Sequence, residues 1–328
     1  MVRTLHIDAD SYQQADLAKL AAIGVMRTAL VRTTEQLLLE LERDPVDALF
    51  VGLGVRVDAR ALKASPTLRW VVSPTTGLDH IDRTTLEGAG VRVVSLLNAR
   101  ERISTVHATA ELTWGLLLAV MRHIPAAHAA AGAGTWDRVP YLGSELHGRA
   151  IGLVGHGRLG AMVAEYARSF GMQVLAHDIE PAAVAALPTS ERVDTADDLL
   201  PQCDVLSLHM KLNDTSRGWL SEERIARLPR GSVVVNTARG DLVDEAALLS
   251  ALRSGHLAGV GADVLAHEMD PDRLRESPLI RAVAEGFNVV LTPHIGGWAQ
   301  DAVALTRSLI VQLFLEQLHS VGCEDVPS

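Results

Sequence analysis

The sequence is poor in cysteine, and it lacks both a membrane-spanning run and a secretory signal. Its two cysteines, Cys203 and Cys323, are too few for a disulfide framework or a cysteine-rich metal site, and they fit a reducing compartment. No stretch of about 18 apolar residues runs without a charged or polar break, so we expect no membrane span. Residues Met1–Asp8 have the pattern of a buried strand and not of a signal peptide. We therefore expect a cytoplasmic protein without a metal site.

The chain also lacks an excess of positive charge. Its 30 lysine and arginine residues against 40 aspartate and glutamate residues give a net charge of −10, which argues against a nucleic-acid partner. Apolar residues make up 48% and charged residues 21% of the 328 residues, a composition that excludes disorder and fibrous repeats. At about 150 residues per domain, this length predicts two domains.

Short apolar runs rich in β-branched residues alternate with segments of helical periodicity along the chain. This alternation is typical of parallel sheets covered on both faces, so the predicted fold class is α/β with two doubly wound parallel sheets. The strands predicted in the first part are Leu5–Asp8, Ala48–Leu53, Trp70–Ser73 and Val91–Ser95. Those in the second part are Ala150–Val154, Gln173–Ala176, Asp204–Leu208, Ser232–Asn236, Gly259–Val264 and Asn288–Leu291.

Three further segments connect or follow the predicted sheets. A long apolar pattern predicts a buried helix from about Thr105 to His123. The small-residue segment Ala126–Gly134 and the irregular segment Trp136–Gly148 come next. A final helix is predicted over Ala299–His319, after the second sheet is complete.

A G-x-G-x-x-G motif, Gly155-His156-Gly157-Arg158-Leu159-Gly160, follows the predicted strand Ala150–Val154 and opens a helix. In this context Gly155 permits a tight turn, Gly157 lets the backbone approach a pyrophosphate, and Gly160 lets helix and strand pack closely. The helix N-terminus supplies N–H groups for the phosphates. An ordinary strand–turn–helix with glycines for geometry alone is the alternative, and the strand on each side makes it the weaker one.

The next strand ends in Asp178, 18 residues beyond Gly160. A carboxylate here is suited to accept hydrogen bonds from the adenosine ribose hydroxyls and repels a 2′-phosphate. Neither Ile179 nor Glu180 offers a cation, although Arg192 could fold back toward the site. The motif therefore predicts NAD(H) in preference to NADP(H).

Ionisable residues follow three strands of the second sheet. They are Arg239, Asp263 with Glu268, and His294. Ligands bind beyond the carboxyl ends of strands in an open parallel sheet, so these side chains are expected to converge there. Each residue taken alone could have no catalytic role, because a single arginine or glutamate is usually a solvated surface charge and a single histidine is usually structural. Together with a dinucleotide site, they suit the reduction of a carbonyl group.

The sequence resembles the D-isomer-specific 2-hydroxyacid dehydrogenase family, which includes D-3-phosphoglycerate dehydrogenases and glyoxylate/hydroxypyruvate reductases. The resemblance runs from about Asp47 to the end of the final predicted helix. It rests, besides the glycine motif with Asp178, on Thr76-Gly77-Leu78-Asp79-His80-Ile81-Asp82, Thr109-Ala110-Glu111, Asn236-Thr237-Ala238-Arg239-Gly240, Asp263 with Glu268, and Thr292-Pro293-His294-Ile295-Gly296-Gly297.

The resemblance implies an NAD-dependent oxidoreductase that acts on CH–OH groups, with Arg239, Glu268 and His294 as catalytic residues. Arg239 would bind the substrate carboxylate and polarise the 2-oxo group. His294 would be the general acid of reduction and the base of oxidation, with Glu268 fixing its tautomer. The backbone N–H groups of Thr76 and Gly77 would also receive the substrate carboxylate.

The resemblance also implies further cofactor contacts, in addition to the glycine motif and Asp178. Asp263 would bind the nicotinamide carboxamide. The other implied contacts are Thr109, Arg158, Leu159, His209, Thr215, Thr237, Ala238 and Gly297.

Departures from the family pattern bear on the substrate. Phosphoglycerate dehydrogenases usually carry an Arg-Ser pair where this chain has Gly52-Leu53, which argues against 3-phosphoglycerate, although Arg56 or Arg102 could substitute. The prediction is a D-2-hydroxyacid dehydrogenase that works as a 2-oxo acid reductase. A phosphite-type or 3-phosphoglycerate dehydrogenase, and a non-catalytic NAD-sensing module similar to the family's corepressors, remain as alternatives. Trp298 either lines the substrate pocket or packs structurally.

The same resemblance predicts the order of the domains. Residues 100–295 would form a Rossmann NAD-binding domain, inserted into a flavodoxin-like substrate domain made of residues 1–99 and 296–328. A segment near 105–148 resembles the arm through which family members form homodimers. The expected partners are therefore a small 2-oxo or 2-hydroxy acid and a second copy of the chain, with neither nucleic acid nor membrane.

Overall fold

The computed structural model describes the backbone of residues 1–324 and the side chains of residues 1–97 and 99–320. It contains two compact units, one formed by Met1–Val106 with the chain from Trp298 onward and the other by His107–Gly297. Each boundary lies a few residues beyond the position predicted from the sequence. Residues 325–328, which the prediction assigned to the substrate domain, lie outside the described residues.

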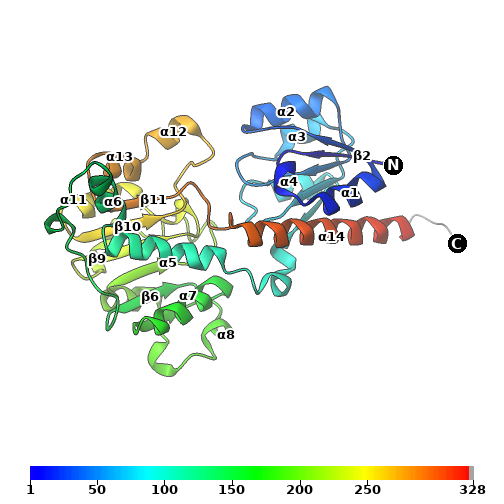
Figure 1. The fold of residues 1–328 in the computed structure, drawn as a ribbon. Coiled ribbons are helices and arrows are strands. Elements are labelled where there is room, and N and C mark those ends of the chain that lie inside the picture. Colours follow the sequence, from blue (N-terminus) through cyan, green and yellow to red (C-terminus); the bar gives the residue numbers. More distant parts are fainter. Residues whose placement is uncertain (325–328) are drawn as a thin grey trace. The chain divides into compact units, whose positions relative to one another are not determined.

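The first unit contains a five-stranded sheet with the order β2-β1-β3-β4-β5, and all neighbouring strands are parallel (Figure 1). Its strands are β1 (Val2–His6), β2 (Gly24–Thr28), β3 (Ala48–Phe50), β4 (Trp70–Ser73) and β5 (Arg92–Ser95). The sequence did not predict β2, because this edge strand is only partly buried and carries no continuous apolar run. The strand order reverses between β1 and β3, which makes their carboxyl ends the switch point of the sheet.

Helices cover both faces of this sheet. The helices are α1 (Gln14–Ile23), α2 (Thr34–Arg43), α3 (Ala59–Ala64), α4 (Arg83–Gly88) and α14 (Gln300–Glu324). Apolar side chains of α2, α3 and α4 pack on one face, and those of α1 and α14 on the other. Phe314 of α14 is fully buried, and its ring lies 5.1 Å from that of Phe50 and 5.6 Å from that of Trp70. The final helix therefore completes the core that the first residues of the chain begin.

The second unit contains a six-stranded parallel sheet with the order β11-β10-β9-β8-β6-β7. Its strands are β6 (Ala150–Val154), β7 (Gln173–His177), β8 (Val205–Leu208), β9 (Ser232–Asn236), β10 (Leu257–Ala262) and β11 (Val289–Leu291). Beyond β7, a single parallel bridge joins Ala176 to Arg192. The switch point of this sheet lies between β6 and β8. The predicted fold class, two α/β units with parallel sheets, is confirmed.

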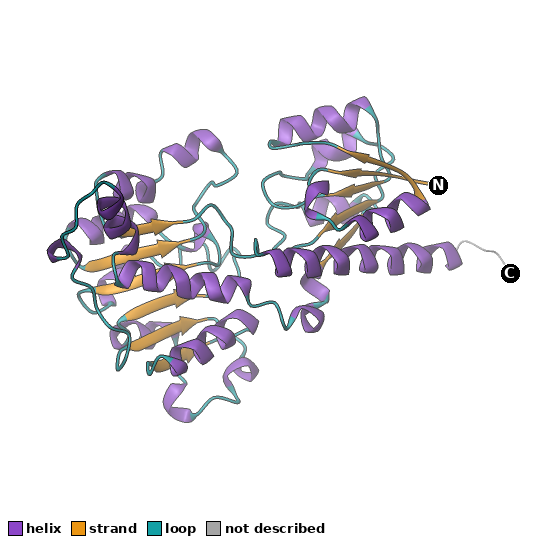
Figure 2. Cartoon of the chain, in the orientation of Figure 1, coloured by secondary structure: helices purple, strands orange, loops and turns teal. Residues whose placement is uncertain are grey.

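Helices also sandwich the second sheet (Figure 2). One face packs against α5 (Ala108–Met121) and α7 (Arg158–Ser169), and the other against α9 (Ala196–Leu199), α10 (Glu222–Arg227), α11 (Glu245–Arg253) and α13 (Pro278–Ala284). The short helices α8 (Pro181–Val184) and α12 (Pro271–Arg275) belong to loops. Within residues 1–324, no helix combines the length and the apolar character needed to cross a bilayer.

The helix predicted from Thr105 to His123 is shorter and is followed by a second helix. It begins at Ala108 and ends at Met121, because His123 adopts a left-handed backbone conformation with φ of 51°. The small-residue segment that follows forms α6 (Ile124–Gly132), none of whose residues is buried. The chain thus presents an exposed helix where the sequence showed no regular element.

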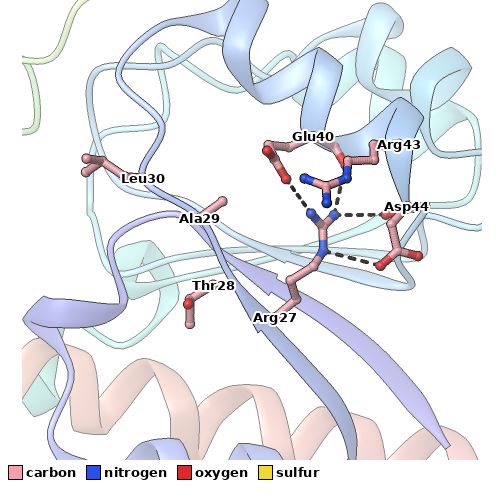
Figure 3. A pocket seen from close by; sticks show the side chains of 7 residues that line it. All are labelled: Arg27, Thr28, Ala29, Leu30, Glu40, Arg43 and Asp44. Atoms are coloured by element: carbon pink, nitrogen blue, oxygen red, sulfur yellow. Dashed lines mark hydrogen bonds and ion pairs between the residues drawn. The ribbon is translucent and has the colours of Figure 1, made fainter.

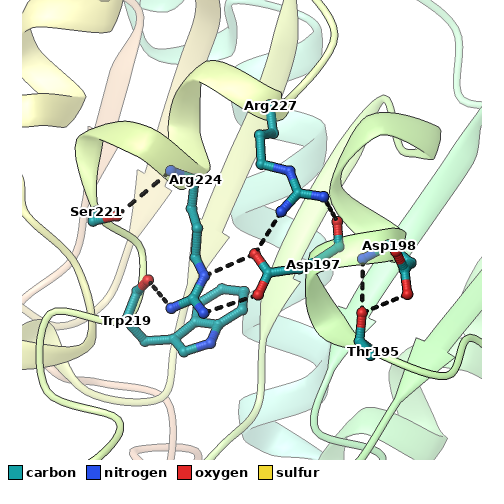
Figure 4. A network of polar contacts seen from close by, with 7 residues as sticks. All are labelled: Thr195, Asp197, Asp198, Trp219, Ser221, Arg224 and Arg227. Atoms are coloured by element: carbon teal, nitrogen blue, oxygen red, sulfur yellow. Dashed lines mark hydrogen bonds and ion pairs between the residues drawn. The ribbon is translucent and has the colours of Figure 1, made fainter.

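A polar network ties α10 to α9 on the second unit (Figure 4). Arg224 donates from Nε and Nη2 to the two carboxylate oxygens of Asp197, both at 3.0 Å, and its guanidinium lies 4.7 Å from the Trp219 ring. Arg227 donates to the same carboxylate at 3.0 Å. This bidentate geometry fixes the two short helices against each other.

His6 at the end of β1 is a buried, neutral histidine. Its ring stacks on Phe50 with 4.0 Å between centroids, and Nε2 is 3.2 Å from Thr4 Oγ1. Burial lowers the pKa of His6 to about 4, from 6.5 for the free side chain. Below pH 6.5 the His6 side chain therefore binds a proton in the unfolded chain but stays neutral in the folded chain. The folded state loses stability as the pH falls toward 4.

Replacing His6 with Phe should remove this pH dependence while keeping the stack on Phe50. Between pH 7 and pH 5, the wild-type chain should lose about 2 kcal/mol more unfolding free energy than His6→Phe, as the linkage of a histidine with these two pKa values requires. Urea denaturation at both pH values measures the difference. His319→Gln, at an exposed position, is the control and should follow the wild type. Equal losses in His6→Phe and the wild type would contradict the assignment.

Candidate active site

The three glycines of the loop after β6 have different surroundings. Gly155 has a φ of +97°, and a Cβ atom on it would lie 2.6 Å from the backbone carbon of His209. A Cβ on Gly160 would lie 2.2 Å from the carbonyl oxygen of Gly155, whereas the space around Gly157 is open. Gly157 also caps α7 without a side-chain hydrogen bond, so the first N–H groups of this helix have no side-chain acceptor at the N-cap. A side chain would therefore collide with main chain at Gly155 and at Gly160, whereas at Gly157 there is free space beside the backbone.

Asp178, just after β7, holds this loop. Its Oδ2 accepts a hydrogen bond from the backbone N–H of His156 at 2.7 Å, and its Oδ1 accepts a hydrogen bond from the backbone N–H of Glu180 at 2.9 Å. The His156 ring donates from Nδ1 to the carbonyl oxygen of Ala183 at 2.9 Å, which ties the glycine loop to α8. Arg192 does not fold back onto Asp178, because its guanidinium donates to carbonyl oxygens of residues 185 and 187.

His209 follows β8, across the switch point from the glycine loop. Its Nε2 is 2.9 Å from Ser207 Oγ, and burial, reinforced by the neighbouring His156, lowers its pKa to about 4. The side chain is therefore neutral near pH 7. Thr215 lies further along in a turn, where its hydroxyl donates to Asn213 Oδ1 at 2.8 Å. No contact among the described residues joins Thr215 to the glycine loop.

The loop after β9 brings Arg239 beside the loop after β10. Asn236 organises this turn, since its Nδ2 donates to the carbonyl oxygen of Arg239 at 2.8 Å and its Oδ1 accepts from Ala238 N at 3.0 Å. A Cβ on Gly240 would lie only 2.0 Å from the carbonyl carbon of Leu265. Glycine is thus required for the backbones of the two loops to touch.

Thr237 has a partner that the sequence did not reveal. Its hydroxyl lies 2.7 Å from the Thr113 hydroxyl of α5, and Thr113 in turn donates to the carbonyl oxygen of Thr109 at 2.8 Å. Two predicted cofactor contacts, Thr109 and Thr237, are therefore joined through one buried threonine. Thr113 lies one helical turn after Thr109, and that spacing is the signal that could have found it.

The carboxylate of Asp263 is almost fully buried and fixes the loop after β11. Its Oδ1 accepts from Thr292 Oγ1 at 2.6 Å and from Ile295 N at 2.8 Å, and its Oδ2 accepts from Gly296 N at 2.7 Å. Burial raises the pKa of Asp263, and these hydrogen bonds and the nearby His294 act in the opposite direction. A Cβ on Gly296 would lie 2.9 Å from Asp263 Oδ2 and 3.1 Å from the Thr109 methyl carbon. The nicotinamide contact assigned to Asp263 stays a prediction, and the structure gives the carboxylate a loop-fixing role.

Glu268 and His294 form a direct pair. His294 Nδ1 is 2.6 Å from Glu268 Oε1, and both side chains are partly exposed. Because a carboxylate only accepts, Nδ1 carries a hydrogen and Nε2 is directed to other chemistry. The backbone of His294 is left-handed, with φ of 54°, and its N–H donates to the carbonyl oxygen of Asp263 at 2.8 Å. The geometry suits an acid–base pair.

A buried glutamate at the start of α11 supports the loop that carries Glu268. Glu245 accepts from the backbone N–H of Ala266 at 2.7 Å and from the Ser277 hydroxyl at 2.5 Å. Its position after the N-cap Asp244 is ordinary for an acidic residue at a helix start, so nothing in the sequence singled it out.

Thr76 and Gly77 lie after β4 in the first unit, whereas the site residues above belong to the second. Among the described residues, no acceptor binds the backbone N–H of either one. Thr75 shapes this loop, since its hydroxyl donates to the carbonyl oxygen of Gly77 at 2.8 Å. The loop thus leaves two adjacent donors available for an anion.

A depression between β2 and α2 is a poorer candidate (Figure 3). The guanidinium of Arg27 is neutralised there by Glu40 and by Asp44, whose Oδ2 lies 3.4 Å from Arg27 Nε. None of the predicted site residues lines it.

Replacing Gly240 with Ala tests the contact between the β9 and β10 loops. The added carbon cannot fit beside Leu265, so the loop carrying Arg239 should shift and kcat/KM should fall by about 100-fold, as misplacements of about 1 Å do. Gly115→Ala is the control, because nothing lies within 4 Å of the position in α5, and it should leave activity unchanged. Steady-state kinetics measures both, and a Gly240→Ala enzyme of wild-type activity would show that the loops tolerate separation.

Comparison with known proteins connects this geometry to a family. The family model "D-isomer specific 2-hydroxyacid dehydrogenase, NAD binding domain" matches residues 114–296. The chain is similar to D-3-phosphoglycerate dehydrogenase of Mycobacterium tuberculosis (strain ATCC 25618 / H37Rv), with 39% identity over 258 residues, which cover 78% of this chain and 46% of the relative. It spans about half the length of the curated relatives it matches.

Solved structures extend the likeness to both units. A protein of Thermus thermophilus is 32% identical with a TM-score of 0.81, and the match covers 97% of both chains. A glyoxylate reductase from Paecilomyes thermophila is 27% identical with a TM-score of 0.76, over 95% of this chain and 93% of that one. The glycine loop, Asp178, Arg239, Glu268 and His294 all lie within the segment that the family model matches. This chain belongs to the D-isomer specific 2-hydroxyacid dehydrogenase family.

Proposed function

We propose that the protein is an NAD(H)-dependent D-2-hydroxyacid dehydrogenase that works as a 2-oxo acid reductase. The pair of Glu268 and His294, held at 2.6 Å beside the Arg239 loop, is the observation that carries this proposal. A histidine whose one nitrogen is bound to a carboxylate is oriented to give or take a proton through the other. That chemistry is what interconversion of a ketone and an alcohol requires.

The residues of the second unit fit NAD(H). The open space at Gly157 and the glycine N-cap of α7 suit a pyrophosphate, and Asp178 offers remaining lone pairs to ribose hydroxyls. Arg192 is occupied by backbone carbonyls, so this arginine does not offset the repulsion between Asp178 and a 2′-phosphate. Bound NADH supplies a hydride from its nicotinamide ring to carbon 2 of the acid.

The chain's own residues handle the proton and the carboxylate. His294 donates the proton on Nε2 to the carbonyl oxygen that becomes the hydroxyl, and in the reverse direction it removes that proton. Glu268 holds the ring in its tautomer and orientation through Nδ1. Arg239 binds the substrate carboxylate through its planar fork. Within the first unit, the N–H groups of Thr76 and Gly77 are suited by themselves to a carboxylate.

3-Phosphoglycerate is the second candidate substrate, because the curated relatives are named D-3-phosphoglycerate dehydrogenase. The residues that could hold its phosphate are engaged elsewhere. Arg56 Nε lies 3.8 Å from Asp58 Oδ2, and Arg102 Nη1 lies 3.6 Å from Glu316 Oε2. We therefore favour an acid without a phosphate group.

Replacing His294 with Asn should lower kcat for 2-oxo acids by about 100- to 10,000-fold with NADH binding retained, because general acid catalysis is lost while the cofactor loop is unchanged. Glu268→Gln should show a smaller loss. NADH oxidation with glyoxylate, hydroxypyruvate, pyruvate, bulkier 2-oxo acids and phosphorylated acids measures the effect, with NADPH run in parallel.

His267→Asn is the matched control. This exposed neighbour of Glu268 has a φ of 60°, a conformation that Asn tolerates, so the variant should keep wild-type activity. Undiminished kcat in His294→Asn, or no turnover of any acid by the wild type, would overturn the proposed function.

We also propose that the protein forms a homodimer through residues 124–148. Large apolar side chains here are strongly exposed: Ile124 by 51%, Trp136 by 94%, Val139 by 77% and Leu142 by 89%. An apolar surface of this kind is typical of a protein–protein interface. A second copy of the chain covers it, with each arm lying on its partner. We place the dimer in the reducing cytoplasm, which the free, buried thiol of Cys203 supports.

The double variant Trp136→Ser/Leu142→Ser should convert the dimer to a monomer of 35.2 kDa, because it removes the two most exposed apolar side chains of the arm. Sedimentation velocity at micromolar concentration measures the mass. Leu30→Ser, at a similarly exposed position of the first unit, should leave the dimer intact. A wild-type monomer would contradict the proposal.

A further inference from the structure

An arginine of the final helix lies at the carboxyl edge of the first unit's sheet, and no role proposed above uses it. Arg307 of α14 donates from Nε to Ser11 Oγ at 2.9 Å and from Nη2 to Asp8 Oδ2 at 3.1 Å. Both partners follow β1. The guanidinium also lies 5.5 Å from the Tyr12 ring and 5.9 Å from the Trp298 ring. This side chain is therefore held rigidly, with its charged end at one place on the sheet edge.

The guanidinium keeps unused hydrogen-bond donors. It has five N–H groups, and the bonds to Ser11 and Asp8 engage two of them. Nη1 makes no hydrogen bond to an acceptor among the described residues. This nitrogen is also not fully buried, so it keeps contact with solvent. A nearly buried arginine with an open, solvent-facing nitrogen is suited to receive an oxygen acceptor from outside.

The position of this guanidinium is the switch point of the sheet, where open α/β sheets bind ligands. A Cβ on Gly52, just after β3, would lie 3.1 Å from Asp8 Oδ2 and 4.0 Å from Arg307 Nη2. A side chain at this position would therefore crowd the Asp8 carboxylate beside Arg307, and glycine avoids that contact. The loop after β4 carries the free N–H groups of Thr76 and Gly77 in the same unit.

We propose that Arg307 binds a second carboxylate, and that the substrate is a dicarboxylic 2-oxo acid. The inference rests on the proposed function, which places the first carboxylate near Thr76 and Gly77. A planar guanidinium can bridge two carboxylates, and Asp8 occupies one side of it while Nη1 offers the other.

Strands β3 and β4 are neighbours in the sheet, so the loops that follow them, one with Gly52 and the other with Thr76 and Gly77, belong to the same carboxyl edge of the first unit.

The test compares acids of equal length with and without the second carboxylate. The kcat/KM of the wild-type enzyme with NADH is measured for 2-oxobutanedioate and 2-oxopentanedioate against 2-oxobutanoate and 2-oxopentanoate. The dicarboxylic acids should be preferred by at least about tenfold, and Arg307→Lys should reduce that ratio by at least about tenfold through KM. The lysine ammonium lacks the planar fork that can hold Asp8 on one side and a second carboxylate on the other.

Structural damage is separated from lost recognition by the ratio itself, because a misfolded edge lowers turnover of both classes alike. The double variant Asp8→Asn/Arg307→Met removes both charges together and avoids leaving Asp8 buried without its partner. It too should lose the preference. Arg102→Met breaks another pair with α14, the one with Glu316, and should leave the ratio unchanged.

The outcomes distinguish this inference from the proposed function. Good reduction of monocarboxylic acids with no dicarboxylic preference, or a preference that survives Arg307→Lys, overturns the role of Arg307 and leaves the dehydrogenase intact. Failure to reduce any acid overturns both.

Discussion

The buried carboxylate of Asp263 is the constraint on which the rest of the active edge depends. A carboxylate with almost no solvent contact must be compensated by hydrogen bonds, and here the Thr292 hydroxyl and the N–H groups of Ile295 and Gly296 provide them. These donors lie on both sides of His294, so satisfying the buried charge fixes the loop. The left-handed backbone of His294 and its contact with Glu268 follow from that requirement.

The close approach of neighbouring loop backbones is the second constraint, and it requires glycine at the points of contact. Gly155 lies against His209 across the switch point of the second sheet, and Gly240 lies against Leu265 between two neighbouring loops. In both places a Cβ atom would collide with main chain, which cannot move aside as a flexible side chain does. The two contacts join the loops that follow β6 and β8 and the loops that follow β9 and β10, and the second pair presents Arg239 and Glu268 on rigid supports.

Much of this arrangement could be predicted, because its signals are local. Apolar runs of four to six residues located most strands, and the spacing of Gly155, Gly160 and Asp178 indicated the nucleotide loop. The misses have physical causes. The edge strand β2 is half exposed and so lacks an apolar run, and the left-handed His123 divides a helix pattern that is continuous in sequence. Thr113 and Glu245 are ordinary residues at ordinary helix positions, and only their distant partners make them part of the site.

The sequence by itself determined the fold class, the family and the kinds of side chain that carry chemistry, since periodicity and motif spacing express constraints between residues near in the chain. Tertiary structure alone decided which of those groups are already engaged. Asp263 is bound to the loop of His294, and Arg307 reaches Asp8 from the far end of the chain, 299 residues away, with one nitrogen left open. Contacts between residues so far apart in the chain form only when the sheet and its covering helices pack together, so no local sequence pattern predicts them.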